Sequence, residues 1–94
     1  MGNTENIYNI IIVDDEKDAR ELLKLLISQH PLFKVISTAS NAEEALISIE
    51  KSRPDLIFLD IEMPGKDGFQ ITQEIHERGM ETDVIFVTAH NHYA

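Results

Sequence analysis

Short apolar segments alternate along the chain with longer segments in which apolar residues recur every three or four positions. Predominantly apolar stretches occupy residues 8–13, 56–59 and 84–87, and such stretches are typical of strands buried on both faces of a parallel sheet. Residues 33–39 alternate apolar and polar side chains, which predicts a half-covered strand nearer an edge of the sheet. The pattern therefore predicts four strands.

Three helices are predicted between these strands. The first is expected to end before Pro31, and the second to begin with a capping box at Ser40 and Glu43. Pro54 ends the second helix, and Gly79 ends the third as a left-handed C-cap. The helical pattern is carried by Ala19, Leu22, Leu23, Leu26 and Ile27 in the first helix, Ala42, Ala45, Leu46 and Ile49 in the second, and Phe69, Ile71, Thr72 and Ile75 in the third.

Strands that alternate with helices indicate right-handed crossovers and an α/β fold with a doubly wound parallel sheet, covered on both faces. Ligands of such folds bind beyond the carboxyl ends of the strands. Polar residues at these ends are therefore the first candidates for a functional site.

Asp14 and Asp15 follow the first predicted strand, Asp60 ends the third, and Thr88 follows the fourth. A parallel sheet brings these positions to one edge, where three carboxylates repel one another unless a cation neutralises them. A hard cation with oxygen ligands fits, and Mg²⁺ is the one that keeps water ligands and works beside phosphate. A carboxylate near such an ion can attack a phosphoryl group, and a hydroxyl can bind a transferred oxygen.

Charge and composition narrow the class further. Seventeen acidic residues against eight basic ones give a net charge of −9, which argues against binding of nucleic acid or an anionic membrane by this segment. The absence of cysteine excludes disulfides and thiolate metal sites and favours a cytoplasmic setting. The longest unbroken apolar run, residues 10–13, is too short to cross a membrane.

Three stretches, IVDDE at 12–16, FLDIEMPGKDG at 58–68 and VIFVTA at 84–89, resemble in order and spacing the signature segments of response-regulator receiver domains. The resemblance covers essentially the whole chain after its first six residues. It implies a flavodoxin-like fold and a role in two-component signalling, in which a sensor histidine kinase donates a phosphoryl group and the receiver regulates an output such as transcription. Such a domain is not a turnover enzyme, since it catalyses only its own phosphorylation and dephosphorylation.

Carried over position by position, the resemblance makes Asp60 the phosphoacceptor and a metal ligand. It implies that Asp15 binds Mg²⁺ directly, that Asp14 holds it partly through water, and that the backbone carbonyl of Glu62 completes the protein's share of the coordination. Thr88 becomes the switch hydroxyl. The tail at 88–94 is similar to regulators with a LytTR-type DNA-binding output.

Receiver domains continue with a fifth strand, which carries a phosphate-binding lysine, and with further helices. No residue of this chain matches that lysine, so residues 1–94 are interpreted as one receiver domain that is incomplete after its fourth strand. The apolar strand at 84–87 is then an exposed sheet edge, which predicts self-association.

Other interpretations stay open at this point. A haloacid-dehalogenase-like phosphohydrolase also uses an aspartate after an apolar strand, but it needs a second aspartate where Glu62 stands. A non-phosphorylated interaction module is consistent with the unmatched lysine. Each strand-end aspartate can also be a simple turn former or helix cap, and His90 and His92 can be considered as a metal pair that has no third ligand nearby.

Overall fold

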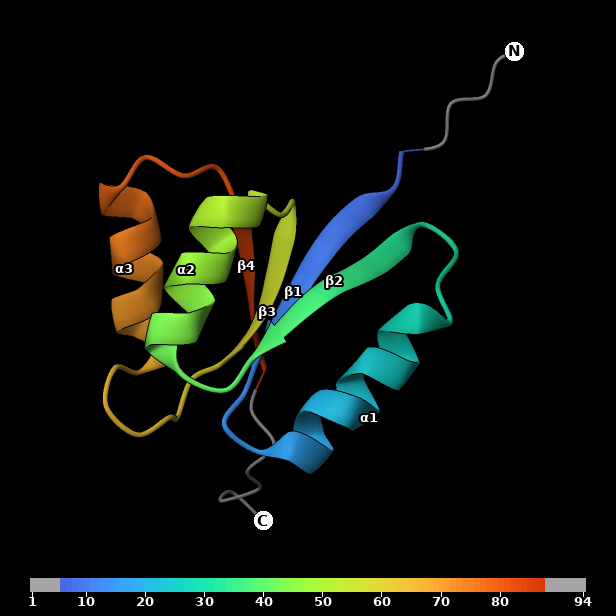
Figure 1. The fold of residues 1–94 in the computed structure, drawn as a ribbon, viewed down its shortest axis with the longest axis horizontal. Helices are drawn as coiled ribbons and strands as arrows, with labels where there is room; N and C mark the ends of the chain where they lie inside the picture. The colour runs from blue at the N-terminus through green and yellow to red at the C-terminus, as the bar shows by residue number, and fades with distance from the viewer. Residues whose placement is uncertain (1–5, 88–94) are drawn as a thin grey trace.

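The computed structural model describes residues 6–87 of the chain, and within them four strands alternate with three helices (Figure 1). The strands are β1 (Tyr8–Val13), β2 (Phe33–Ala39), β3 (Leu56–Asp60) and β4 (Asp83–Val87), and the helices are α1 (Lys17–Ser28), α2 (Ala42–Ser52) and α3 (Gly68–Glu77). All strand pairs are parallel, in the order β2-β1-β3-β4. The predicted doubly wound α/β fold is confirmed, and none of these helices is long and apolar enough to span a membrane.

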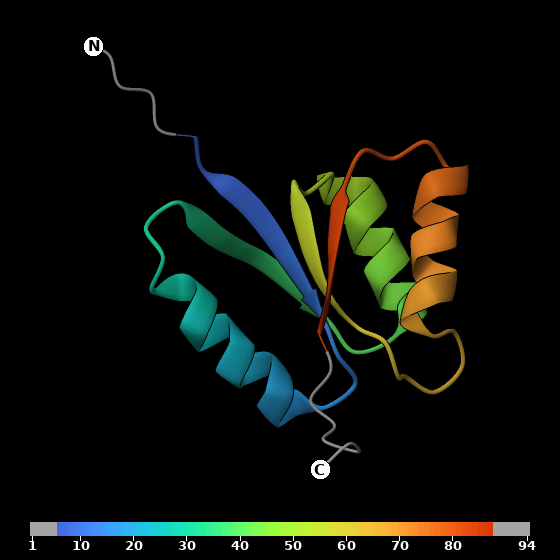
Figure 2. The ribbon, with the colours of Figure 1, turned by 180° about the vertical axis from the view of Figure 1, so that it is seen from behind.

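The helices divide unequally between the two faces of the sheet, as both ribbon views show (Figures 1 and 2): α2 and α3 lie side by side on one face, and α1 lies on the other. The face under α2 and α3 holds the larger core. It comprises Ile11, Val13, Ala39, Ala42, Ala45, Leu46, Ile49, Ile57, Leu59, Met63, Ile71, Ile75 and Met80. Every apolar position predicted for the second helix is in this core.

The face under α1 is less completely covered, and here the sequence-based prediction of the buried helix positions is partly wrong. Of the predicted stripe, Ile27 is buried and Leu23 packs against the core, but Leu22 and Leu26 are 58% and 54% exposed. Periodicity marks a face that can be buried, whereas burial needs a neighbouring element. Among residues 6–87, α1 is the only helix on this face.

The start of α2 also differs from the prediction, by one residue. The N-cap is Asn41, whose side chain accepts a hydrogen bond from the backbone N–H of Glu44. The predicted capping pair of Ser40 and Glu43 is therefore wrong, and Glu44 instead accepts from both the backbone N–H and the hydroxyl of Ser40. The predicted left-handed conformation of Gly79 is confirmed by its φ of 68°.

Strand register determines which residues meet at the carboxyl edge of the sheet. Val13 of β1 is paired with Leu59 of β3, so Asp14 and Asp60 each follow directly on this pair. Asp60 is in turn paired with Val87 of β4. The carboxyl end of β3 thus lies between the ends of β1 and β4, at the one edge of the sheet where the sequence predicts that these strand ends meet.

Candidate functional site

The three aspartates predicted from the sequence lie together at the carboxyl edge of the sheet. Asp14, Asp15 and Asp60 each offer a carboxylate oxygen, and these oxygens all lie within 4.8 Å of one another. Asp14 and Asp60 are buried, with exposures of 8% and 5%, whereas Asp15 is exposed. The cluster therefore combines two constrained carboxylates with one that faces solvent.

Local hydrogen bonds fix the first turn of the site. The Asp14 carboxylate accepts from the backbone N–H of Glu16 at 2.9 Å, and its own N–H donates to the Ala39 carbonyl of β2 at 3.1 Å. The Arg20 guanidinium donates to the Asp14 carbonyl at 2.8 Å. Asp14 is thus a turn former as well as a member of the cluster, but it does not cap α1, whose N-cap is Glu16.

Asp60 is held in a similar way. Its Oδ1 accepts from the backbone N–H of Glu62 at 3.2 Å, which orients the carboxylate from the loop that follows β3. That loop folds back on the strand, since the N–H of Gly68 donates to the Ile61 carbonyl at 2.9 Å. A Cβ on Gly68 would lie only 2.8 Å from the Asp60 carbonyl oxygen, so only glycine fits beside the Asp60 backbone.

Gly68 and Arg20 were not identified as site residues from the sequence. In the sequence Gly68 is only the last residue of the stretch at 58–68, because its contact with Asp60 depends on tertiary distance rather than on spacing. Arg20 stands six residues after Asp14, on the first turns of α1. An arginine on the first turns after an acidic strand end is the signal that could have identified it.

The remaining predicted positions fall in two groups. Glu62 lines a shallow depression next to Asp15, together with Glu16, Met63 and Pro64, so the loop that follows Asp60 borders the cluster. Thr88, His90 and His92 lie outside the described residues.

The aspartate cluster fits a small hard cation. All three donors are carboxylate oxygens, as Mg²⁺ prefers, and the depression beside Asp15 leaves room for the waters that this ion keeps. Two oxygens on opposite sides of one Mg²⁺ are about 4.2 Å apart, given ligand distances of roughly 2.1 Å. Three ligands cannot all be opposite one another, and adjacent ones are about 3 Å apart, so the carboxylates must draw closer together from separations of up to 4.8 Å to bind one ion.

Comparison with known proteins agrees with this arrangement. Residues 10–94 match the model of the response regulator receiver domain family. The chain is 47% identical over 87 residues to the positive alginate biosynthesis regulatory protein of Pseudomonas aeruginosa, with 92% of this chain and 35% of that protein covered. It is 36% identical over 86 residues to the sensory transduction protein LytT of Enterococcus faecalis, with 92% and 36% covered.

Solved structures of response regulator domains are also similar to this chain. The response regulator domain of Thermotoga maritima CheB matches with a TM-score of 0.83 and 32% identity, over 89% of this chain and 62% of that one. The chain spans about a third of the length of the curated relatives described above. The family match covers most of the sequence and the fold is shared, so this chain belongs to the receiver-domain family of two-component response regulators.

Proposed function

We propose that Asp60 accepts a phosphoryl group while Asp14, Asp15, Asp60 and the backbone carbonyl of Glu62 hold Mg²⁺. The observation that carries the proposal is the cluster of three carboxylates within 4.8 Å at the end of two paired parallel strands. Three unneutralised carboxylates at this distance repel one another, so the arrangement favours a bound divalent cation.

Mg²⁺ bound here supplies charge neutralisation and polarises the phosphoryl oxygens. Asp60 supplies the nucleophile: one carboxylate oxygen forms a bond to phosphorus while the bond from phosphorus to the donor's histidine nitrogen breaks. The departing imidazole takes up a proton from solvent. The backbone N–H of Glu62 holds the Asp60 carboxylate in place through its hydrogen bond to Oδ1.

Thr88 completes the proposal as the switch hydroxyl that binds a phosphoryl oxygen. Its support is the register of the sheet, since Val87, the residue before it, is paired with Asp60. The domain then turns over no separate substrate and catalyses only its own phosphorylation and dephosphorylation.

The proposed phosphodonor is a sensor histidine kinase, and the proposed location is the cytoplasm, where such a kinase would phosphorylate it. The curated relatives are about three times as long as the matched segment, which leaves room for an output domain. A LytTR-type DNA-binding output that regulates transcription is proposed from the resemblance of residues 88–94. The acidic segment itself, at −9, is not expected to bind DNA.

The test is incubation of the chain with acetyl phosphate and Mg²⁺, followed by intact-mass measurement. We expect a gain of one phosphoryl group that hydroxylamine removes and that is lost both in Asp60→Asn and after chelation of Mg²⁺. Asp83→Asn is the matched control, because Asp83 is an exposed aspartate at the opposite end of the sheet. A chain that binds Mg²⁺ at the cluster but gains no phosphoryl group would contradict the proposal and favour an interaction module.

A further inference from the structure

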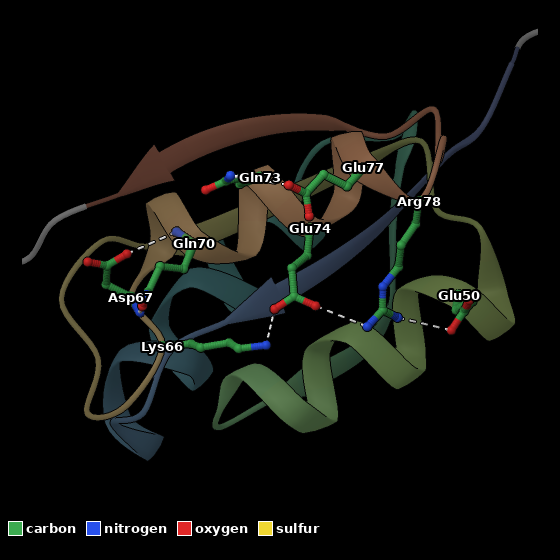
Figure 3. A network of polar contacts seen from close by, with 8 residues as sticks. All are labelled: Glu50, Lys66, Asp67, Gln70, Gln73, Glu74, Glu77 and Arg78. Atoms are coloured by element: carbon green, nitrogen blue, oxygen red, sulfur yellow. Dashed lines mark hydrogen bonds and ion pairs between the residues drawn. The ribbon is translucent and has the colours of Figure 1, made fainter.

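A chain of charged side chains connects the loop after Asp60 to both helices on its side of the sheet (Figure 3). The Lys66 ammonium in the loop pairs with Oε2 of Glu74 on α3. The other oxygen of Glu74 accepts from Arg78 at 3.0 Å, and Arg78 also reaches Glu50 of α2 at 3.2 Å. The position of Glu74 is thereby fixed from both of its oxygens.

Lys66 directly follows the part of this loop that packs least against the rest of the protein. The end of the loop is fixed by the capping box of Asp67 and Gln70, and its first half by the buried side chain of Met63. Between them, Pro64 and Gly65 are exposed, and the φ of Gly65 is 82° with no atom within 4 Å of the place where a Cβ would stand. The Lys66–Glu74 pair therefore holds a segment that has little packing of its own.

The same loop borders two surfaces. On one side, Glu62 and Pro64 line the depression next to Asp15. On the other side, Pro64 and Lys66 line an open groove against α2, with Arg78 at its border. Pro64, two residues before Lys66, is thus shared by the groove and the depression.

We propose that Lys66 is a positioning residue for the Mg²⁺ site: through its ion pair with Glu74 it holds the β3–α3 loop so that the backbone of Glu62 stays beside Asp15 and Asp60. This inference rests on the metal site of the proposed function. Partly exposed ion pairs contribute little free energy, and the side chains of Lys66 and Glu74 are 47% and 22% exposed. Loss of the pair is therefore expected to weaken Mg²⁺ binding by about two- to fivefold.

The direction of the effect separates positioning from simple electrostatics. Replacement of Lys66 by methionine removes a positive charge near an acidic cation site, and on Coulomb's law alone this would strengthen Mg²⁺ binding. If Lys66 positions the loop, the same substitution weakens Mg²⁺ binding. The sign of the change is thus informative even though its size is small.

The experiment is a titration with Mg²⁺ alone, followed by the backbone amide signals of the intact chain in two-dimensional NMR spectra. Lys66→Met and Glu74→Gln are each expected to weaken binding about two- to fivefold, whereas Lys66→Arg retains most of it. Lys51→Met is the matched control, because it removes the same charge from an exposed position on α2. Thermal unfolding of each variant checks that the fold is kept.

The possible failures are distinguishable. If the wild-type chain shows no Mg²⁺-dependent shifts around Asp14, Asp15 and Asp60, the proposed metal site itself is wrong. If the wild-type chain binds Mg²⁺ and Lys66→Met binds it equally well or more tightly, the metal site stands and the positioning role of Lys66 is refuted. A Lys66→Arg variant that binds Mg²⁺ as weakly as Lys66→Met would also count against the ion pair.

Discussion

Asp14 and Asp60 each combine a structural hydrogen bond with a place in the carboxylate cluster. Each accepts from the backbone N–H two residues further on, as aspartates in turns commonly do. Each nevertheless keeps an oxygen within 4.8 Å of its neighbours' oxygens. The plain interpretation of these aspartates as turn formers is therefore compatible with the chemical interpretation, because a carboxylate has two oxygens and several acceptor positions.

Gly68 offers a test of how closely α3 packs against the Asp60 backbone. In an open helix, Gly→Ala stabilises by roughly 0.5–1 kcal/mol. Here the new methyl group would meet the Asp60 carbonyl oxygen at 2.8 Å and the Ile61 Cα at 3.0 Å, both of them backbone atoms that cannot easily move. We expect Gly68→Ala to lower the free energy of unfolding by about 1–3 kcal/mol, as overpacking does, in urea denaturation.

The control for this prediction is Gln73→Ala on the exposed side of the same helix, which is expected to change stability by no more than about 0.5 kcal/mol. A Gly68→Ala variant as stable as the wild type would show that the contact relaxes without cost.

The aspartates could be predicted from the sequence because strand ends are visible in hydrophobic patterning. The role of Gly68 could not, because no local pattern encodes the approach of two backbone segments.

At the scale of the elements, the N-terminus of α2 is held by several side-chain hydrogen bonds. Asn41 caps the helix, and Glu44 reaches back to the N–H and hydroxyl of Ser40. The hydrogen bond from the Ser40 backbone N–H is the main cause that lowers the pKa of the Glu44 carboxyl below its ordinary value of 4.5. The ionised form of Glu44 is thus favoured in the folded state.

This lowered pKa predicts a pH dependence of stability. Because the pKa of Glu44 is lower in the folded than in the unfolded chain, its contribution is fully present above the unfolded value. It is lost as the pH falls below about 4.5 and through the folded pKa. The difference in free energy of unfolding between the wild type and Glu44→Gln should therefore be constant near neutral pH and shrink in acid.

Urea denaturation of both variants from neutral pH to pH 3 would measure this difference, with Glu43→Gln as the control. Glu43 lies in the same first turn of α2, so it experiences the same helix dipole, but its side chain is not the one that reaches Ser40. An equal pH dependence for Glu43→Gln would assign the effect to the helix dipole instead.

The elements also show where sequence-based prediction ends. The strands and helices can be predicted from the sequence because apolar runs and helical spacing are strong signals. The structure confirms the apolar positions predicted for α2, since Ala42, Ala45, Leu46 and Ile49 are all buried. The predicted capping residue is wrong by one position because Ser40 and Asn41 are both good caps. Only the backbone conformation decides between them, and it gives the role to Asn41.

At the scale of the whole molecule, the two faces of the sheet differ in coverage, and the outer edge of β4 has no neighbouring strand within residues 6–87. On β4, Ile85 is 43% exposed and Phe86 38% exposed, and Phe86 packs against the exposed Phe69 of α3 with ring centres 5.0 Å apart. An open edge with apolar side chains is a template for association with another chain. We therefore propose that the 94-residue chain self-associates through β4.

The net negative charge of the chain opposes this association, so the association is expected to depend on salt. At −9 two copies repel each other, and added salt screens that repulsion, with a Debye length of about 10 Å at 0.1 M and about 3 Å at 1 M. Apolar contacts do not weaken in the same way. Sedimentation equilibrium should accordingly show an average mass that rises with protein concentration and rises further with salt.

Two lysine substitutions locate the surface. Ile85→Lys places a charge on β4 and is expected to shift the chain toward monomer, with circular dichroism to confirm that the fold is retained. Ile47→Lys makes the same change of charge at a residue of α2 that is 62% exposed, away from the β4 edge, and should leave the association intact. Because each lysine also reduces the net negative charge, equal effects of the two variants would show a general charge effect. A wild-type chain that stays monomeric at every concentration and salt level would instead rule out association through this edge.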